Sequence, residues 1–462
     1  MLGSPQQFDP KRESNRGDHS AHARTSRFHG HSHYSLVSRM LSALFLNRCA
    51  MTHKEPKNFN PHPYSYHQEL VLEITSLTNL GAGVAKPDDW VVMVPFTVPG
   101  ERVRARIYRN HKNFSEADLI EVLEPSPDRV QPVCPLFGRC GGCQYQHLSY
   151  TAQLEWKRSH VQETFLRIAG IEIKAATPIH SEHIFGYRSK ITPHHQQPRN
   201  GVLGPLGFLA QSSRTSIVDV ESCAIATPAI NEALLLARQQ REQDAKRGRI
   251  RKGATLLLRD SMEGVTMDHA RVISERVGQC LFQFKAGDFF QNNPFVLPKM
   301  VETVVQRAAA SGLPFLIDAY CGSGLFGVSA ADSFQEVLGI EVNESSVHWA
   351  RANAAINRKE NCKFLVGQAE TVFAEVPFAG KDCVVVIDPP RKGCDTVFLE
   401  QLFRFSPARL VYVSCDPATQ ARDVAACLAN GYRIEEVQPV DLFPQTRHIE
   451  NMAVLVHGSA KP

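Results

Sequence analysis

The sequence predicts a multidomain α/β protein with a small β-barrel near the N-terminal end, a central α+β segment and a Rossmann-like sheet at the C-terminal end. Three observations predict this organisation. Residues 69–124 alternate apolar and polar side chains with a period of two, as antiparallel strands do. Residues 134–143 contain three closely spaced cysteines, which is typical of a metal-binding segment. From residue 286 onward, short apolar runs alternate with helical patterns, as in a parallel sheet that is buried on both faces.

Length and composition exclude several classes of protein. The chain has 462 residues, of which 43% are hydrophobic and 21% are charged, as in globular proteins with more than one domain. The net charge of +4 is mild, so affinity for nucleic acid would depend on local basic patches. No apolar run reaches the roughly 18 residues of a membrane helix, so no membrane partner is expected. Twelve cysteines are too few for a disulfide scaffold in so long a chain, which favours a reducing compartment such as the cytoplasm.

Residues 1–58 differ from the rest of the chain. They are rich in Ser, Arg and His and contain few apolar side chains, so we expect a disordered extension. A mis-assigned start is an equal alternative, because Met51 directly precedes the ordered-looking chain. A mitochondrial presequence within residues 1–50 is a further alternative, although Asp9, Glu13 and Asp18 argue against it.

Residues 59–124 predict a barrel of five strands. Alternating patterns over 70–74, 90–94 and 119–123 are separated by turns rich in Gly and Pro. One stretch, 101–107, places its arginines on one face and Val103, Ala105 and Ile107 on the other. Two interpretations of the arginines stay open, a solvated strand face and a phosphate-binding stripe.

Residues 125–285 form the predicted central domain. A helix over 150–169 should stop at Gly170, and the charged stretch 238–252 is expected to be an exposed loop. Four cysteines in this domain are candidate metal ligands: Cys134, Cys140, Cys143 and Cys223. Four thiolates suit zinc or an iron–sulfur cluster, and the spacing slightly favours zinc. A disulfide is the third interpretation.

Residues 286–462 predict a doubly wound parallel sheet with a cofactor site. Strands are expected over 315–320, 337–341, 383–388 and 410–413, with a helix over 345–358. The glycines Gly322 and Gly324 follow the first strand, and Glu341 ends the next one, where a carboxylate can hold a ribose. This spacing also fits a dinucleotide such as NAD. The acidic Asp318 before the glycines and the turn that begins at Asp388 favour S-adenosylmethionine instead.

A cysteine at the end of a buried strand points to covalent chemistry. Cys415 follows the apolar run 410–413 and is itself followed by polar residues, so its thiol should open into the ligand crevice of the sheet. A thiolate that adds to C6 of a uracil makes C5 nucleophilic toward a methyl sulfonium, and a base must then remove the C5 proton. Cys415 is the candidate nucleophile and Glu450 the candidate base. Arg391, Arg447 and His448 are candidates for raising the thiolate fraction.

These motifs occur together and in order, and the chain resembles the RNA 5-methyluridine methyltransferases, specifically the large-subunit ribosomal RNA type with an iron–sulfur cluster. The resemblance runs from about residue 60 to 458 and rests on Gly81–Ala85, the four cysteines, the Ser-Cys-Asp-Pro segment around Cys415 and the His-Ile-Glu segment that ends at Glu450. It implies an N-terminal TRAM barrel, a central cluster-bearing domain and a class I methyltransferase domain.

The resemblance also implies roles for individual residues. Cys415 matches the nucleophile and Glu450 the base of the family. The cysteine pattern implies a [4Fe-4S] cluster rather than zinc. The positions implied to bind S-adenosylmethionine are Gln291, Tyr320, Gly322, Gly324, Glu341, Gln368 and Asp388. Leu325 and Gln368 depart from side chains that relatives carry.

The expected activity is therefore methylation of C5 of one uridine in RNA by a monomeric enzyme. Ribosomal RNA is the favoured substrate, because a barrel and a cluster accompany that branch of the family, and transfer RNA is the alternative. A cluster-containing RNA-binding protein without catalytic activity is a second hypothesis, motivated by Leu325 and Gln368.

Overall fold

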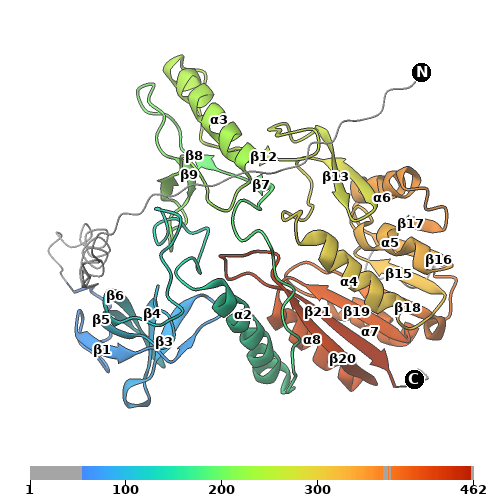
Figure 1. The fold of residues 1–462 in the computed structure, drawn as a ribbon, viewed down its shortest axis with the longest axis horizontal. Helices are drawn as coiled ribbons and strands as arrows, with labels where there is room; N and C mark the ends of the chain where they lie inside the picture. Colours follow the sequence, from blue (N-terminus) through green and yellow to red (C-terminus); the bar gives the residue numbers. More distant parts are fainter. Residues whose placement is uncertain (1–54, 368–372, 374–375, 459–462) are drawn as a thin grey trace, which may run out of the picture. The chain divides into compact units, whose positions relative to one another are not determined.

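The computed structural model describes residues 55–367, 373 and 376–458, and Glu55–Pro462 form one compact unit (Figure 1). The predictions for residues 1–54, which concern disorder, a presequence and an alternative start, lie outside the described residues. The cofactor role expected of Gln368 lies outside them as well. In the part of the chain that the structure describes, no helix combines the length and the apolar character that crossing a membrane requires.

The first part of the described chain is a six-stranded sheet with the order β1-β5-β6-β4-β3-β2. Its strands are β1 (Glu69–Glu73), β2 (Ser76–Leu77), β3 (Ala82–Ala85), β4 (Val91–Pro95), β5 (Arg102–Asn110) and β6 (Phe114–Glu124). Only Ile74 and Thr75 separate β1 from β2, so consecutive stretches of one segment form the two edges of the sheet. The strand expected over 70–74 corresponds to β1, and β2 is an additional short strand that follows it. The apolar side of these strands forms its own core around Val92, Val103 and Ala117.

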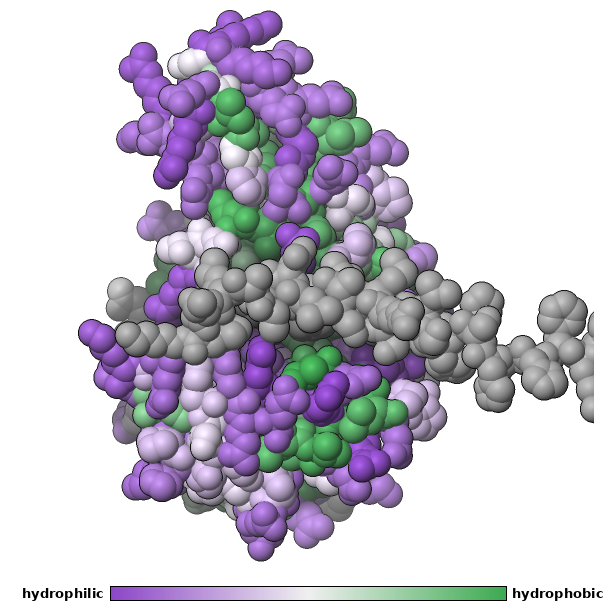
Figure 2. Space-filling model, turned by 90° about the vertical axis from the view of Figure 1, so that its left-hand side faces the viewer, coloured by the Kyte–Doolittle hydropathy of each residue, from purple (hydrophilic) through white to green (hydrophobic). Residues whose placement is uncertain are grey.

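The arginines of β5 face carboxylates of neighbouring strands. Arg102 pairs with Glu124 at 2.9 Å, Arg104 with Glu121 at 2.7 Å, and the last arginine, Arg109, with Glu116 at 3.8 Å. The structure therefore favours the solvated, ion-paired face over the phosphate-binding stripe. The side of the molecule that carries this sheet faces the viewer in Figure 2, where hydrophilic side chains predominate around smaller hydrophobic patches.

The central residues form helices and short strands. They comprise α2 (Tyr150–Thr164) with a π-helical turn (Phe165–Ala169), β7 (Lys190–Ile191), β8 (His194–His195), β9 (Leu206–Leu209), β10 (Ile217–Asp219), α3 (Pro228–Lys246), β11 (Ala254–Thr255), β12 (Leu258–Arg259), β13 (Val272–Val277) and β14 (Cys280–Lys285). The helix predicted to stop at Gly170 does so, with that glycine in the left-handed region at φ 67°. The loop expected over 238–252 is wrong for its first half. Thr227 caps α3, whose apolar face reaches Ala237, and the charged residues continue the helix to Lys246.

The C-terminal part is a seven-stranded sheet with the order β17-β16-β15-β18-β19-β21-β20. Its elements are α4 (Leu297–Ala309), β15 (Phe315–Ala319), α5 (Leu325–Ala330), β16 (Glu336–Glu341), α6 (Glu344–Ile356), β17 (Cys362–Val366), β18 (Cys383–Ile387), α7 (Thr396–Phe405), β19 (Arg409–Ser414), α8 (Pro417–Ala429), β20 (Tyr432–Val440) and β21 (Glu450–His457). The parallel sheet predicted from the apolar runs is confirmed for β15 to β19. It is wrong for β21, which inserts between β19 and β20 and runs antiparallel to both.

Both faces of this sheet are covered, as Figure 1 shows. Helices α4, α5 and α6 cover one face, and α7, α8 and the end of α2 cover the other. The hairpin β13–β14 belongs to the first of these cores and donates backbone N–H groups to Asn353 of α6 and to Asn357, which caps the end of that helix. The α/β core therefore begins before residue 286, the boundary that the change in sequence pattern suggests.

Candidate active site

Cys415 and Glu450 face each other at the end of the sheet. Ser414 of β19 is in register with Asn451 of β21, and Cys415 and Glu450 are the next residues on the two antiparallel segments. Residues opposite each other in such a pair have Cβ atoms about 4.5–5.5 Å apart. The thiol is half-buried, whereas the carboxyl side chain is 4% exposed. The two candidate catalytic residues are therefore brought together by strand pairing.

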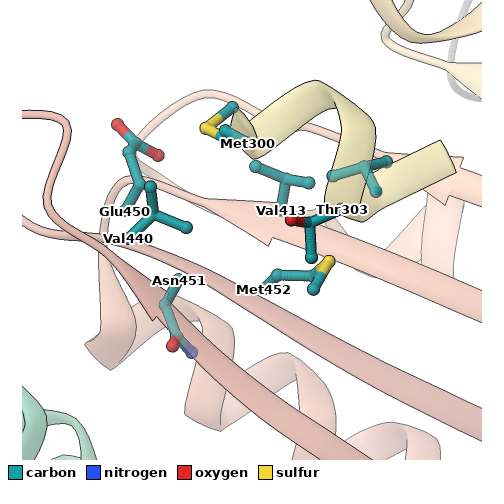
Figure 3. Close-up of a pocket in the computed structure, with 8 residues that line it drawn as sticks. Met300, Thr303, Val413, Val440, Glu450, Asn451 and Met452 are labelled. Carbon is teal, nitrogen blue, oxygen red and sulfur yellow. The ribbon is translucent and has the colours of Figure 1, made fainter. Parts of the chain in front are cut away.

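The environment of Glu450 is largely apolar. Figure 3 shows its carboxylate beside Met300 and Val440, on the side of β21 that faces α4, whereas Asn451 points to the opposite side. Asn451 donates a hydrogen bond to Gln420 Oε1 of α8 at 2.6 Å. Burial and the charge of Asp388 raise the pKa of Glu450 well above its usual value, although Arg391 opposes this. A buried carboxylate of this kind is a stronger base than one in water.

The loop after β18 brings Asp388 and Arg391 to the same place. Three residues of α8 hold this loop: Thr419 Oγ1 donates to Arg391 O at 3.2 Å, Arg422 donates to the carbonyl oxygens of Lys392 and Cys394, and Asp423 accepts the N–H of Cys394 at 2.9 Å. Asp423 also accepts the Tyr412 hydroxyl at 2.7 Å. These tethers are absent from the expectations because Arg422 and Asp423 belong to no motif of the sequence.

The charges around Cys415 oppose its ionisation. Burial and the carboxylates of Glu450 and Asp388 together raise the pKa of the thiol to about 11, although Arg391 lowers it through its charge and a hydrogen bond. Asp416 caps the following helix by accepting the N–H of Ala418 and Thr419, which fixes the turn that carries the thiol. Three residues were expected to favour the thiolate: Arg391, Arg447 and His448. Of these, Arg391 is the residue that lowers the pKa of the Cys415 thiol.

A cradle for a nucleoside cofactor lies beside these residues. Glu341 ends β16, and its carboxylate accepts the N–H of Gly322 at 3.2 Å and of Asn343 at 2.9 Å. Gly322 and Gly324 have φ of 51° and 84°, a region that favours glycine. Asp318 is fully buried, and one of its oxygens accepts the N–H of Gly327 at 2.7 Å while the other has no partner in the described chain. Burial raises the pKa of Asp318 to about 7. The unpartnered oxygen and the open glycine turn fit a bound nucleoside cofactor.

The remaining residues that were expected to bind the cofactor lie on several different elements. Tyr320 lies directly before the glycine turn, has φ of 65°, and packs its ring against Phe398 at 5.0 Å. Gln291 is buried in the loop before α4. Asp388 is partly exposed, and burial raises its pKa to about 7. The structure thus places Tyr320, Gly322, Gly324, Glu341 and Asp388 at the carboxyl ends of β15, β16 and β18, where ligands bind in open α/β sheets.

The four candidate metal ligands lie in one neighbourhood. Burial raises the pKa of Cys140 and Cys143, and the charges of Cys134 and Cys223 add to this, so these thiols are close enough to interact. The cysteines are all free thiols, and Gln146 accepts the N–H of Cys134 at 2.9 Å. Their donor atoms suit a soft metal centre. Within residues 55–367, 373 and 376–458, however, no group of three or more His, Cys, Asp or Glu side chains is placed to hold a metal ion.

Comparison with known proteins connects this geometry to a reaction. Residues 256–457 match the family model described as "tRNA (Uracil-5-)-methyltransferase". A relative from Schizosaccharomyces pombe named "tRNA (uracil(54)-C(5))-methyltransferase" is 39% identical, with 85% of this chain and 79% of the relative covered. The chain belongs to the RNA uracil-5-methyltransferase family.

One further relative and one solved structure support the same family assignment. A Saccharomyces cerevisiae protein of the same name is 33% identical over 86% of this chain and 75% of its own. The crystal structure of a Pyrococcus abyssi tRNA (uracil-54, C5)-methyltransferase in complex with S-adenosyl-L-homocysteine has a TM-score of 0.64 and 26% identity, and covers 84% of this chain and all of that one. The fold is a multidomain α/β fold with a class I methyltransferase part. The enzyme is an S-adenosylmethionine-dependent RNA uracil-C5 methyltransferase. Because these relatives are named for transfer RNA, the alternative substrate is better supported than ribosomal RNA.

Proposed function

We propose that the enzyme methylates C5 of a uridine in transfer RNA, at the position that its relatives' names give as 54, through a covalent bond between Cys415 and the base. The observation that carries the chemistry is the placement of Cys415 opposite Glu450, beside the cofactor cradle at the ends of β15, β16 and β18. The named relatives support transfer RNA as the substrate. The enzyme is proposed to act as a monomer.

The thiolate of Cys415 forms a bond from Sγ to C6 of the uracil, which places negative charge on C5 and O4. Bound S-adenosylmethionine supplies the methyl group, which C5 takes as the bond from that methyl to the sulfonium sulfur breaks. Glu450 then removes the proton from C5, and the bond from Sγ to C6 breaks, so that the thiolate returns and the ring regains its double bond. The proton ends on the Glu450 carboxylate, whose raised pKa suits it to accept one.

Arg391 and Asp388 have opposite effects on the first step. Arg391 lowers the pKa of the Cys415 thiol, which favours attack, whereas Asp388 raises it. We assign Asp388 to the cofactor side of the crevice, together with Gln291, Tyr320, Gly322, Gly324 and Glu341. A flipped uracil would then lie between these groups and Glu450, because a stacked base in RNA cannot present C6 to a thiol.

The remaining parts of the chain are assigned to RNA binding and stability. Residues 59–124 would form the TRAM barrel of the family and, with residues 125–285, would hold the RNA around the target base. Residues 286–462, joined by the hairpin β13–β14, would carry the chemistry. Cys134, Cys140, Cys143 and Cys223 would hold a [4Fe-4S] cluster as a structural centre, since the reaction needs no electron transfer.

The test is methyl transfer from labelled S-adenosylmethionine to two matched RNAs, a transfer RNA transcript and a large-subunit ribosomal RNA fragment. We expect label in the transfer RNA and its loss when uridine 54 is replaced by cytidine. Label in the ribosomal fragment alone would favour the other substrate. A folded enzyme that binds S-adenosylmethionine by calorimetry but labels neither RNA would contradict the proposed substrate, and one that does not bind it would support the hypothesis of an inactive RNA-binding protein.

A further inference from the structure

Helix α2 buries a polar face in addition to the apolar side chains of Ala152 and Val161. Gln153, Lys157 and His160 are 1%, 1% and 9% exposed and occupy one side of the helix. Lysine is almost never fully buried unless it is paired. The buried face therefore has specific partners, and two of its three polar residues contact the loop between β20 and β21.

Residues 441–449, hereafter the base loop, connect β20 to Glu450 at the start of β21. Lys157 Nζ lies 2.6 Å from Asp441 Oδ1 and also donates to Phe443 O at 3.1 Å. Gln153 exchanges two hydrogen bonds with Gln445, its amide N–H donating to Gln445 Oε1 and its Oε1 accepting the Gln445 backbone N–H, both at 3.0 Å. Helix α2 therefore holds the base loop at both Asp441 and Gln445.

Other elements hold the same loop through its backbone. The N–H groups of Gln144 and Tyr145 both donate to Gln445 O, at 3.1 and 3.0 Å. Tyr187 donates its hydroxyl to Pro444 O at 2.9 Å, and Asn293 donates to Leu442 O at 2.9 Å. Of all these contacts, the pair of Lys157 and Asp441 is the one between two opposite charges, and both side chains are at most 1% exposed.

Asp441 stands next to the catalytic end of β21. Its neighbour Val440 is in register with Glu450 in the β20–β21 pair, so Asp441 is one residue away from the partner of Glu450. A displacement of Asp441 would therefore also displace the start of β21, which carries the Glu450 carboxylate. Tyr150 also interacts with the Asp441 carboxylate but carries no positive charge, so loss of Lys157 would leave a buried charge without a counter-charge.

We propose that Lys157 is a positioning residue for Glu450, and that its buried ion pair with Asp441 holds the base loop so that the carboxylate stands opposite Cys415. The proposal rests on the proposed function, in which Glu450 removes the C5 proton after methyl transfer. Lys157 acts through Asp441 and does not touch the substrate. Its loss should slow proton removal while leaving attack by Cys415 and methyl transfer intact.

The experiment measures the methylated covalent adduct between enzyme and RNA, detected on denaturing gels with S-adenosylmethionine labelled in the methyl group. The variants are K157M and, because K157M can fail to fold with an unpaired buried Asp441, the double variant K157M/D441N, which buries no unpaired charge. The reference is E450Q, which removes the base itself. The matched control is H160A, on the same face of α2, where His160 contacts Leu77 O at 2.8 Å and not the base loop.

We expect K157M/D441N, and K157M if it folds, to accumulate several times more methylated adduct than the wild type, with lower kcat and an RNA KM close to that of the wild type. H160A should show wild-type adduct at a comparable loss of thermal stability. Wild-type adduct levels and kcat in the Lys157 variants, with E450Q trapping adduct, would overturn the positioning role. So would equal trapping by H160A, since the effect would then be general loosening. If E450Q itself traps no adduct, the proposed role of Glu450 fails instead.

Discussion

Cys415 and Glu450 are opposite neighbours across the end of the antiparallel pair β19–β21, one step beyond the register pair of Ser414 and Asn451. This relationship explains why the sheet departs from a fully parallel arrangement at this point. A parallel strand in the place of β21 would present its carboxyl end, not its first residue, beside Cys415. The inserted antiparallel strand lets a residue near the end of the chain reach a thiol at the end of β19.

The first prediction concerns the order of the chemical steps. If Glu450 acts after methyl transfer, E450Q should form an adduct with RNA that already contains the labelled methyl group, and turnover should fall by at least about a hundredfold, as for loss of a general base. C415A should form no adduct and should show no turnover, yet should bind RNA with an affinity close to that of the wild type. Gel shift with labelled S-adenosylmethionine measures the adduct. An E450Q adduct without label would place Glu450 before methyl transfer.

The second prediction concerns the reactivity of Cys415. Glu450 raises the pKa of the thiol and Arg391 lowers it, so the two neighbours should have opposite effects on the thiolate fraction. At pH 8 a thiol with a pKa near 11 is only about 0.1% ionised. E450Q should therefore speed alkylation of Cys415 by iodoacetamide, and R391M should slow it, with the midpoint of the rate against pH moving down and up respectively.

The readout for this prediction is mass spectrometry of the peptide that contains Cys415, which separates it from the other cysteines. C415A gives the background of that peptide. Shifts in the same direction for E450Q and R391M would show that burial alone, and not these two charges, governs the thiol.

The third prediction links Asp388 to stability. Burial raises its pKa to about 7, against an ordinary value near 3.9, so the folded state binds a proton that the unfolded state has lost between these values. Stability should therefore fall as pH rises from about 4 to about 7. D388N removes this cost and should stabilise the cofactor-free enzyme at pH 8 by about 1–3 kcal/mol, a range discounted because the side chain is partly exposed.

Urea unfolding of D388N and the wild type at pH 8 and pH 5 measures this effect. The difference between the two proteins should shrink at pH 5, where Asp388 is protonated in the folded enzyme. The same variant should lose most of its methyl transfer activity. An equal stabilisation at both pH values would mean that shape rather than charge accounts for the gain.

Particular residues show which parts of this site the sequence could predict. The apolar run before Cys415 and the glycines after β15 revealed both strand ends, because a buried parallel strand leaves a continuous apolar pattern. Strand direction leaves no such pattern, so Glu450 is a candidate base in the sequence, whereas the antiparallel insertion of β21 that places it opposite Cys415 is not predicted. The polar buried face of α2 has no signal in the sequence for a related reason. Lys157 is polar in the sequence, and only its distant partner Asp441 makes its burial favourable.

The fourth prediction compares two groups of arginines in RNA binding. The guanidinium groups of β5 are paired with carboxylates, as Arg104 is with Glu121. For Arg447 we find no ion pair with a carboxylate in the described chain, and the side chain is exposed beside the site. R447M should therefore weaken RNA binding and reduce the slope of log K against log salt by about one, whereas R104M should change neither appreciably. Filter binding across a salt series measures both. A larger loss for R104M would revive the phosphate-binding stripe.

The fifth prediction concerns the four cysteines. If Cys134, Cys140, Cys143 and Cys223 hold a [4Fe-4S] cluster, anaerobically purified enzyme should contain iron and acid-labile sulfide in equal amounts, with broad visible absorbance, and C143S should lose all three. Zinc by elemental analysis, or a thiol count lowered by two without metal, would instead support the zinc or disulfide interpretation. C280A is the matched control, because Cys280 is buried in the α/β core.

Gln144 and Tyr145, which follow Cys143, hold the base loop through Gln445 O. C143S should therefore also raise the level of methylated adduct, a coupling that C280A should not produce.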